Sequence, residues 1–345
     1  MEDVSGFYLF TLLVPAGLAW GCVSLYKSKN QWGAKNKGFI ITWNLALTLT
    51  LLTALFAIGE TWYRFVLDTT DSFGLNKITT RWMHRHFQPN GQGFRDNQDW
   101  EMARTPGKRR ITFIGDSFTA GHGVESVDDR FANRIRKAHP EWEIHIMGNN
   151  GLETEDVGYL IERFALDYAY EFEELVYVYN INDIATLLPQ TKVLYDKMER
   201  LQADMGFWAR QSYLINTWYY RLSASQIPEI KSYYDYVLSA YSGETWKRQV
   251  QQLLEVQNYC QRQRIRLKVV LFPFLHEQKD PTAYAGIHQQ LLTYWQQADV
   301  PCLDLLPVFE PHQGEDLKVN AYDAHPNEQA HAIAAEAIDT FLEKN

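Results

Sequence analysis

The second part of the chain alternates between two hydrophobic patterns. Short apolar runs rich in β-branched and aromatic residues predict strands at residues 111–115, 143–148, 175–180, 266–273 and 300–306. Between them, apolar residues recur at the three- and four-residue spacing of a helix. These segments predict helices at residues 129–140, 153–170, 242–263, 284–298 and 326–344. Alternating strands and helices indicate an α/β fold with a parallel sheet covered on both faces.

The first part of the chain has a different pattern, with two long runs that carry no charge. We predict transmembrane helices at about 5–26 and 38–59, because each run is long enough to cross about 30 Å of hydrocarbon. Trp62 and Tyr63 follow where an interfacial aromatic belt would lie. A cleaved signal peptide is disfavoured for the first run, because the chain starts with acidic Glu2 and Asp3. A buried helical hairpin is the alternative for both.

The connection between the two apolar runs sets the expected orientation. It holds Lys27, Lys29, Lys35 and Lys37, whereas no lysine or arginine precedes it. The positive-inside rule therefore places this connection in the cytoplasm and everything after about residue 63 outside it, in a periplasmic or extracellular position. The basic residues Arg64, Lys77, Arg81 and Arg85 oppose this orientation slightly.

Three regions follow from these patterns. Residues 1–63 form the membrane hairpin, residues 64–108 are a polar connector, and residues 109–345 are the α/β domain. The domain has a helical, aromatic-rich insertion at about 184–244, which either packs as a core of its own, lines a substrate groove or rests on the bilayer. In the connector, His84 and His86 are more typical of a solvated pair than of a metal site.

Composition excludes one class of function. The formal net charge is −9, so a general nucleic-acid binder with a basic face is not expected. Cys260 and Cys302 lack metal-type spacing, and we expect two buried thiols rather than a disulfide.

Polar residues follow the predicted strands with regularity. Ser117 follows the first strand, and His276 follows the fourth. The second and third strands are followed by the groups Asn149, Asn150, Gly151 and Asn180, Asn182, Asp183, and the segment 323–327 precedes the last helix. In parallel α/β sheets, reactive residues gather beyond the carboxyl ends of the strands. These polar groups are therefore expected at one edge of the sheet.

Four of these blocks occur in a diagnostic order. They are GDSFTAG at 115–121, GNNGLET at 148–154, NIND at 180–183 and DAHPN at 323–327. This series resembles the SGNH (GDSL-type) serine hydrolase family, over about residues 110–345 with the insertion unaligned. The resemblance implies a three-layer α/β/α sandwich, here with a five-stranded parallel sheet after two transmembrane helices. It also implies a serine esterase without cofactor or metal ion.

The resemblance assigns roles residue by residue. Ser117 is the expected nucleophile, His325 its general base, and Asp323 the carboxylate that orients the histidine. The oxyanion hole would be formed by the backbone N–H groups of Ser117 and Gly151 and by the side-chain amide of Asn182. The alternative interpretation of Ser117 is an ordinary turn or N-cap residue.

Two positions depart from the family pattern. Asn180 stands where the third block usually has glycine, and Tyr322 stands where the last block usually has its aspartate. Asp323 lies one residue later, two residues before His325, and is the expected third member of the triad. Asp116 and Asp183 are expected to be structural, and His122 and His276 to form walls of the site.

The expected protein is thus a membrane-anchored serine esterase or O-acyltransferase with its catalytic domain outside the cytoplasm. Acylated envelope carbohydrate is the leading substrate class. The alternatives are a lipid esterase and a catalytically impaired envelope scaffold that keeps the fold. The sequence does not predict the oligomeric state.

Overall fold

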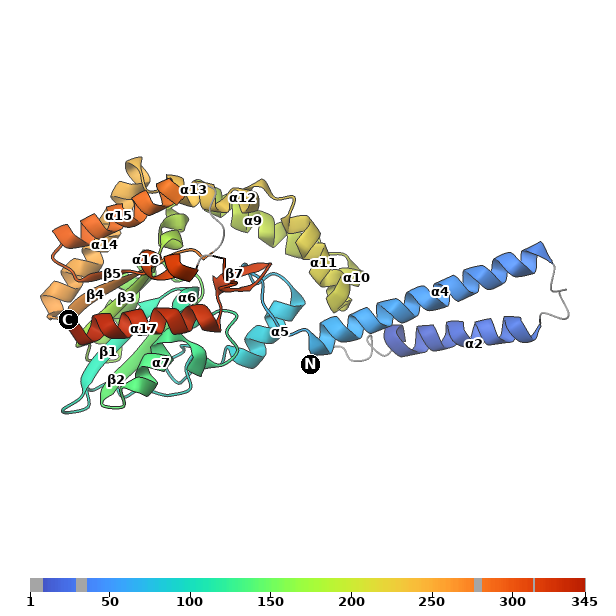
Figure 1. Cartoon of the computed structure of the whole chain (residues 1–345), viewed down its shortest axis with the longest axis horizontal. Coiled ribbons are helices and arrows are strands. Elements are labelled where there is room, and N and C mark those ends of the chain that lie inside the picture. The colour runs from blue at the N-terminus through green and yellow to red at the C-terminus, as the bar shows by residue number, and fades with distance from the viewer. Residues whose placement is uncertain (1–8, 29–35, 276–280, 313, 345) are drawn as a thin grey trace. The chain divides into compact units, whose positions relative to one another are not determined.

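The computed structural model describes residues 9–28, 36–275, 281–312 and 314–344. Its centre is a five-stranded sheet in the order β2-β1-β3-β4-β5 (Figure 1). All neighbouring strands are parallel, which confirms the predicted α/β fold with a five-stranded parallel sheet. The strands are β1 (Arg109–Gly115), β2 (Trp142–Gly148), β3 (Glu174–Asn180), β4 (Arg266–Phe272) and β5 (Cys302–Asp304).

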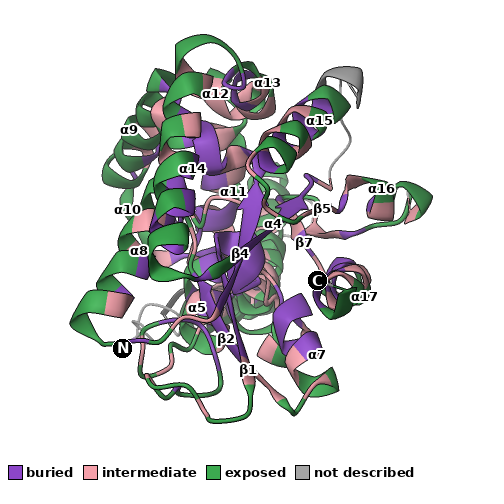
Figure 2. Cartoon of the chain, turned by 90° about the vertical axis from the view of Figure 1, so that its left-hand side faces the viewer, coloured by how far each residue is buried: buried purple, intermediate pink, exposed green. Residues whose placement is uncertain are grey.

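Helices lie on both faces of this sheet. On one face, α8 (Thr154–Asp167) packs beside α14 (Gly243–Gln263), and on the other, α7 (Phe131–Ala138) packs beside α17 (Glu328–Lys344). Figure 2 shows the buried sides of these helices turned toward the buried strands. The buried face of α17 follows a four-residue repeat, Ala330, Ala334, Ile338 and Leu342, as an amphipathic helix requires. A further helix, α15 (Pro281–Gln297), packs beside β5.

In strands β1 to β4, the charged residues lie toward the amino ends, away from Ser117. Glu174, in the central strand β3, is fully buried and accepts hydrogen bonds from Lys268 Nζ and Arg109 Nη2, both at 2.8 Å. On β2, Glu143 forms an ion pair with Arg110 at 2.8 Å. A buried charge is tolerated only when it is paired and hydrogen-bonded. These ion pairs lie at the amino ends of the strands, and the polar loops follow the carboxyl ends.

The chain divides into two compact units. The sheet unit comprises Thr69–Gly74, Trp82–Met198 and Ile227–Asn345, and the helical unit comprises Met1–Asp68, Leu75–Arg81 and Glu199–Gln226. Within the sheet unit lie the short helices α6 (Ser117–Ala120), α12 (Pro228–Lys231), α13 (Tyr233–Ser239) and α16 (Leu306–Phe309), and the antiparallel pair β6 (Lys318–Asn320) and β7 (Asp323–Pro326). Two helices have residues in both units, α5 (Lys77–His86) and α9 (Pro189–Ala203). Each unit therefore draws on segments that are distant in the sequence.

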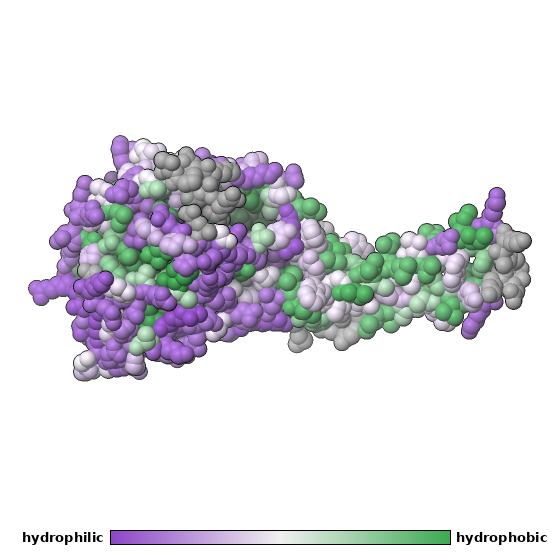
Figure 3. Space-filling model, in the orientation of Figure 1, coloured by the Kyte–Doolittle hydropathy of each residue, from purple (hydrophilic) through white to green (hydrophobic). Residues whose placement is uncertain are grey.

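The helical unit contains α2 (Val14–Lys27), α4 (Lys37–Thr61), α10 (Phe207–Gln211) and α11 (Tyr213–Ala224). Helices α2 and α4 pack against each other, with Cys22 Sγ 3.3 Å from Thr50 Oγ1 and the rings of Tyr26 and Trp43 5.7 Å apart. Figure 3 shows apolar residues along the surface of both helices. The two apolar runs thus form a helical hairpin.

The prediction of two membrane spans needs correction. Among the residues that the structure describes, one helix is long and apolar enough to cross a membrane, Lys37–Val66, with 30 residues and a mean hydropathy of 1.9 in its most apolar window. The first predicted span starts outside the described residues, and its α-helix α2 has 14 residues. At 1.5 Å per residue, α2 covers only about 21 Å. Pro15 lies in its first turn, after a π-helical turn at Leu9–Leu13.

The cysteines are all free thiols. Cys260 is buried and Cys302 is half-buried, so the possible disulfide between them is not formed.

The close packing of α6 on β2 requires glycine at position 148, and this can be tested. A Cβ atom at Gly148, the last residue of β2, would lie 2.6 Å from the backbone nitrogen of Ala120 in α6. We expect Gly148→Ala to lower the free energy of unfolding by about 1–3 kcal/mol, because backbone must move to admit the methyl group. Denaturant unfolding of the purified chain measures this change.

A matched control is Gly158→Ala, in the interior of α8. A Cβ atom there would meet its nearest neighbour, Val256 Cγ2, at an ordinary 3.7 Å. This change should be neutral or stabilising by up to about 1 kcal/mol, because alanine favours helix interiors. Equal effects of the two substitutions would contradict the close packing of α6 on β2.

Candidate active site

Ser117 lies on the turn that follows strand β1, which pairs with β2 on one side and with β3 on the other. Asp116 is the N-cap of α6, and its Oδ1 accepts a hydrogen bond from the backbone N–H of Phe118 at 2.9 Å. The four-residue helix ends at Gly121, which has φ +70°. A left-handed residue ends a helix sharply, and glycine adopts this conformation without strain. The GDS segment therefore turns the chain at the strand end and holds Ser117 in a fixed position.

Two buried arginines hold the other end of this turn. Arg95 Nη1 and Arg130 Nη1 donate to the carbonyl oxygen of Ala120 at 3.1 and 3.2 Å. Arg95 also donates to the carbonyl oxygens of Gly121 and Val124. The last carbonyls of a helix lack partners within the helix, and positive charge there is favourable. Arg95 comes from the predicted connector, so that segment supports the serine turn.

His325 and Asp323 lie on β7. Side chains two residues apart in an extended strand point to the same face. His325 Nδ1 is 2.5 Å from Asp323 Oδ1, and His325 Nε2 is 2.8 Å from Ser117 Oγ. The structure thus joins the three residues that the sequence selects into one hydrogen-bonded chain. The departure at Tyr322 is explained by this geometry, because Tyr322 is 50% exposed and Asp323 already faces the histidine.

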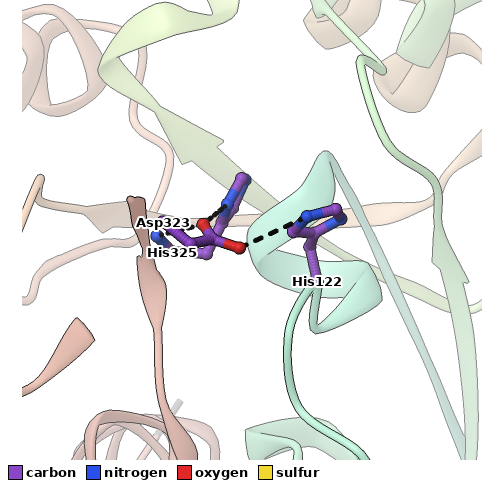
Figure 4. A group of neighbouring side chains, drawn as sticks. All are labelled: His122, Asp323 and His325. Atoms are coloured by element: carbon purple, nitrogen blue, oxygen red, sulfur yellow. Dashed lines mark hydrogen bonds and ion pairs between the residues drawn. The ribbon is translucent and has the colours of Figure 1, made fainter. Parts of the chain in front are cut away.

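The other oxygen of the Asp323 carboxylate has partners of its own. Thr70 Oγ1 donates a hydrogen bond to Oδ2, and His122 Nε2 lies 3.4 Å from the same atom. Figure 4 shows the carboxylate between the rings of His122 and His325, whose centroids are 4.5 Å apart. Asn150 Nδ2 lies 2.9 Å from His122 Nδ1, an arrangement in which the amide donates and His122 carries its proton on Nε2. His122 is therefore part of the site, although the sequence gave it no partner.

Electrostatics favour a charged aspartate and a neutral histidine. Burial alone would raise the pKa of Asp323, but the positive charge of protonated His325 and the hydrogen bonds from His122 and His325 hold this pKa well below its ordinary value. Burial lowers the pKa of His325 below 6.5, although the Asp323 carboxylate opposes this. A neutral imidazole facing a serine hydroxyl can accept its proton.

The side chains of His122, Asp323 and His325 are also close enough to one another to form a metal site. Ligand atoms of His122, Asp323 and His325 all lie within 4.8 Å of one another, so these three side chains could hold a metal ion. However, both ring nitrogens of His325 already face partners, Asp323 and Ser117, and His122 Nδ1 faces Asn150. A bound metal ion would have to displace these hydrogen bonds, so the donor set fits proton transfer better than metal binding.

The two predicted oxyanion loops flank the serine turn. Gly151 follows β2 and Asn182 follows β3, and both strands pair with β1. Gly151 has φ +73°, a backbone conformation that glycine adopts freely. Apart from its chain neighbours, no described residue has an atom within 4 Å of a Cβ built there.

The departure at Asn180 also has a structural reason. Asn180 is fully buried and is the N-cap of the 3-10 turn Ile181–Leu187, where its Oδ1 accepts a 3.4 Å hydrogen bond from the backbone N–H of Asn182. The side chain that replaces glycine thus supports the loop that carries Asn182.

Two carboxyl groups are buried beneath these loops. Asp183 Oδ2 accepts a 2.7 Å hydrogen bond from Tyr177, and no partner for Asp183 Oδ1 or Asp116 Oδ2 is present among the described residues. Burial raises the pKa of Asp116 to about 7 and that of Asp183 well above its ordinary value. Burial therefore favours the protonated, neutral form of both groups, and the structural role expected for them stays a prediction.

The aromatic insertion reaches this edge of the sheet through α13. Burial raises the pKa of Tyr233 well above its ordinary value, and the nearby side chain of Asn182 opposes this; burial and the charge of Asp323 raise the pKa of Tyr234 to about 12. The rings of Tyr234 and Phe274 pack 5.0 Å apart. The α13 part of the insertion therefore lies near Asp323 and Asn182, and its role as a wall of a substrate groove stays a prediction.

The remaining candidates fall outside the hydrogen-bonded group. His276 lies outside the described residues, and His84 is exposed on α5. Sequence reasoning missed Thr70 altogether and expected His122 only as a wall of the site. The signal for His122 was its place in the block after Ser117, whereas Thr70 belongs to a segment with no motif.

No protein-family model matches the chain, and no curated protein matches it. Among solved structures, it is similar to a lipolytic protein of the G-D-S-L family from Desulfitobacterium hafniense, with 11% identity, coverage of 68% of this chain and 99% of that one, and a TM-score of 0.42.

Two further structures are similar at the same level. A lipolytic G-D-S-L protein from Veillonella parvula has 15% identity, coverage of 69% and 100%, and a TM-score of 0.42. A catalytic mutant of an acetylxylan esterase from Geobacillus stearothermophilus has 14% identity, coverage of 68% and 95%, and a TM-score of 0.40. At these TM-scores the likenesses carry no inference about substrate or residue roles in this chain.

The electrostatics of the site predict the titration of His325. In the chain labelled with ¹⁵N-histidine, NMR should show His325 becoming protonated only below pH 6.5, because burial disfavours its charged form. Asp323→Asn should lower this pKa further, because the carboxylate that favours the imidazolium is removed.

His139 provides the internal control. Burial would lower its pKa, but its bonds to Glu141 and Asp339 raise it above 6.5. A pKa for His325 at or above that of His139 would contradict the electrostatic account.

Proposed function

We propose that the protein is a serine esterase or acyl-transferring hydrolase with Ser117 as nucleophile. The observation that carries the proposal is the hydrogen-bonded chain from Ser117 Oγ through His325 to Asp323. A serine hydroxyl is a weak nucleophile until an adjacent base accepts its proton, and a base oriented by a third group is the signature of such activation.

The proposed reaction has two stages. Ser117 Oγ attacks the ester carbonyl carbon while its proton passes to His325 Nε2, and Asp323 stabilises the imidazolium that forms. His325 then returns the proton to the departing alcohol oxygen, which leaves an acyl-serine. Water, or the hydroxyl of an acceptor, attacks this acyl group with the same base, and Ser117 is restored.

The carbonyl oxygen becomes negatively charged in both stages. The backbone N–H groups of Ser117 and Gly151 and the amide of Asn182 are the proposed donors to this oxygen. Such a donor typically contributes a factor of about 10²–10³ in rate. The positions of the Gly151 and Asn182 loops on both sides of the serine turn support this assignment.

We further propose that α4 anchors the enzyme in a membrane. None of the most apolar window of Lys37–Val66 is buried in the structure, whereas the core helix of a soluble protein would be mostly buried. The lysines between the apolar runs support an orientation with that connection in the cytoplasm and the sheet unit outside it, in a periplasmic or extracellular position.

Acylated envelope carbohydrate is the substrate class that we propose. An enzyme held outside the cytoplasm would meet such esters, and aromatic walls such as Tyr233 and Tyr234 combine an apolar face with a hydroxyl that can hydrogen-bond a sugar. Lipid esters are the second candidate, because α4 would keep the enzyme at the bilayer.

Replacement of the nucleophile is the direct test of the chemistry. Ser117→Ala should reduce hydrolysis of p-nitrophenyl acetate by at least about 10³-fold, because no other hydroxyl takes its place beside His325. Equal turnover by the variant would contradict the assignment. Absence of turnover by the wild-type chain as well, including with acylated carbohydrate and lipid esters, would favour a scaffold that keeps the fold.

A pair of adjacent variants tests the third member of the triad. Asp323→Asn should lower kcat by about 10²–10⁴-fold, because the histidine loses both its orientation and its counter-charge. Tyr322→Phe is the matched control and should stay near wild type, since Tyr322 is half-exposed. A larger loss in Tyr322→Phe would show that the family's usual position is the functional one.

The orientation can be measured with alkaline phosphatase fused after Asn345. This reporter is active only outside the cytoplasm, so the proposed orientation predicts high activity in cells. A matching cytoplasmic reporter, β-galactosidase, should be inactive at the same position. The reverse pattern would place the sheet unit in the cytoplasm and exclude extracellular carbohydrate as substrate.

A further inference from the structure

The C-terminal end of α4 contains a buried carboxylate, that of Glu60. Glu60 is 2% exposed, and its carboxylate accepts hydrogen bonds from Ser212 Oγ at 2.6 Å and from the backbone N–H groups of Tyr213 and Leu214, both at 3.0 Å. These are the N-cap and first residues of α11. A carboxylate at a helix N-terminus satisfies N–H groups that have no partner in the helix and interacts favourably with its dipole.

Arg64 completes this connection. It forms an ion pair with Glu60 at 2.9 Å and donates to the carbonyl oxygen of Gln211 at 2.8 Å, at the end of α10. A Cβ atom at Gly59 would lie 3.2 Å from Leu214, so the glycine lets α11 approach α4 closely. The α10–α11 segment is therefore fixed to α4 at the level of Glu60.

The length of α4 determines the depth at which Glu60 would lie in the proposed membrane. About 20 residues suffice to cross the hydrocarbon layer, so a span counted from Gly38 ends near Ala57. Glu60 and Arg64 then fall in the headgroup region, and so does the segment that they hold.

The outer surface of this segment is apolar. Phe207 is 61% exposed, Trp218 is 44% exposed and Leu222 is 62% exposed. Trp218 and Leu222 are four residues apart, so they share one face of α11. On α4, Ile58 and Trp62 are exposed by 68% and 54% at the same spacing. Exposed apolar side chains therefore lie on α4 as well as on α10 and α11.

We propose that α10–α11 is an interfacial membrane-binding element, whose partner is the bilayer that α4 crosses. Tryptophan is enriched at the membrane–water interface, and an amphipathic helix there buries its apolar face at the boundary of headgroups and acyl chains. The guanidinium of Arg221 lies 5.5 Å from the centre of the Trp218 ring. This inference rests on the proposed membrane span of α4 and is independent of the chemistry at Ser117.

Spin-label accessibility tests this proposal with the full chain in nanodiscs of phosphatidylethanolamine and phosphatidylglycerol. A nitroxide is attached at Leu222→Cys or Phe207→Cys, and collisions with oxygen and with a water-soluble nickel complex are compared. Labels in the bilayer meet oxygen, whereas labels in water meet nickel. We expect an oxygen-to-nickel ratio several-fold higher at both positions than at Gln202→Cys, an exposed polar position of the same unit.

Two further controls separate the outcomes. The unsubstituted chain reports labelling of its own cysteines, and Leu51→Cys, exposed in the middle of α4, reports the span itself. A high ratio at Leu51 with a low one at Leu222 and Phe207 would overturn the interfacial element while keeping the span. A low ratio at Leu51 would overturn both. Protection of Leu222 and Phe207 from both reagents would indicate a protein partner, such as a second copy, and would also overturn the proposal.

Discussion

The candidate site depends on one buried charge, the carboxylate of Asp323. A carboxylate removed from water must receive hydrogen bonds or it becomes protonated. Asp323 receives them from His325 on one oxygen and from Thr70 on the other, with His122 close by. These partners come from three separate parts of the chain, which are β7, the segment after β1 and the segment before α5. The Asp323 carboxylate therefore contacts all three. The imidazole that faces Ser117 is thereby fixed in orientation.

The extended backbone of β7 makes this arrangement possible. Asp323 and His325 share a face because they are two residues apart in a strand. A helical backbone would separate them, and only a spacing of three or four would then bring them together. The unusual position of the aspartate is thus matched by the local structure. The pairing of β6 with β7 helps to hold the segment extended.

The strands of the sheet could be predicted because each is marked by a short run of neighbouring residues in the sequence. Each strand is a buried apolar run, and the predicted strands match β1 to β4 within one or two residues at each end. The β6–β7 pair was not predicted, because the segment DAHPN looks like a loop before a helix. The roles of Thr70 and His122 were also beyond the sequence, since they arise from contacts between distant segments. The first apolar run has the composition of a span, but Pro15 and a π-helical turn leave its α-helix short among the described residues.

The central claim is that Ser117 is activated by its neighbours, and a fluorophosphonate probe measures this without knowledge of the substrate. The probe forms a phosphonate ester with an activated serine oxygen, and mass spectrometry of the digested protein locates it. The account predicts a single adduct on Ser117 in the native chain and none after unfolding, when His325 no longer faces the hydroxyl. An adduct on another residue, or a native chain that stays unlabelled under conditions that label a known serine esterase, would contradict it.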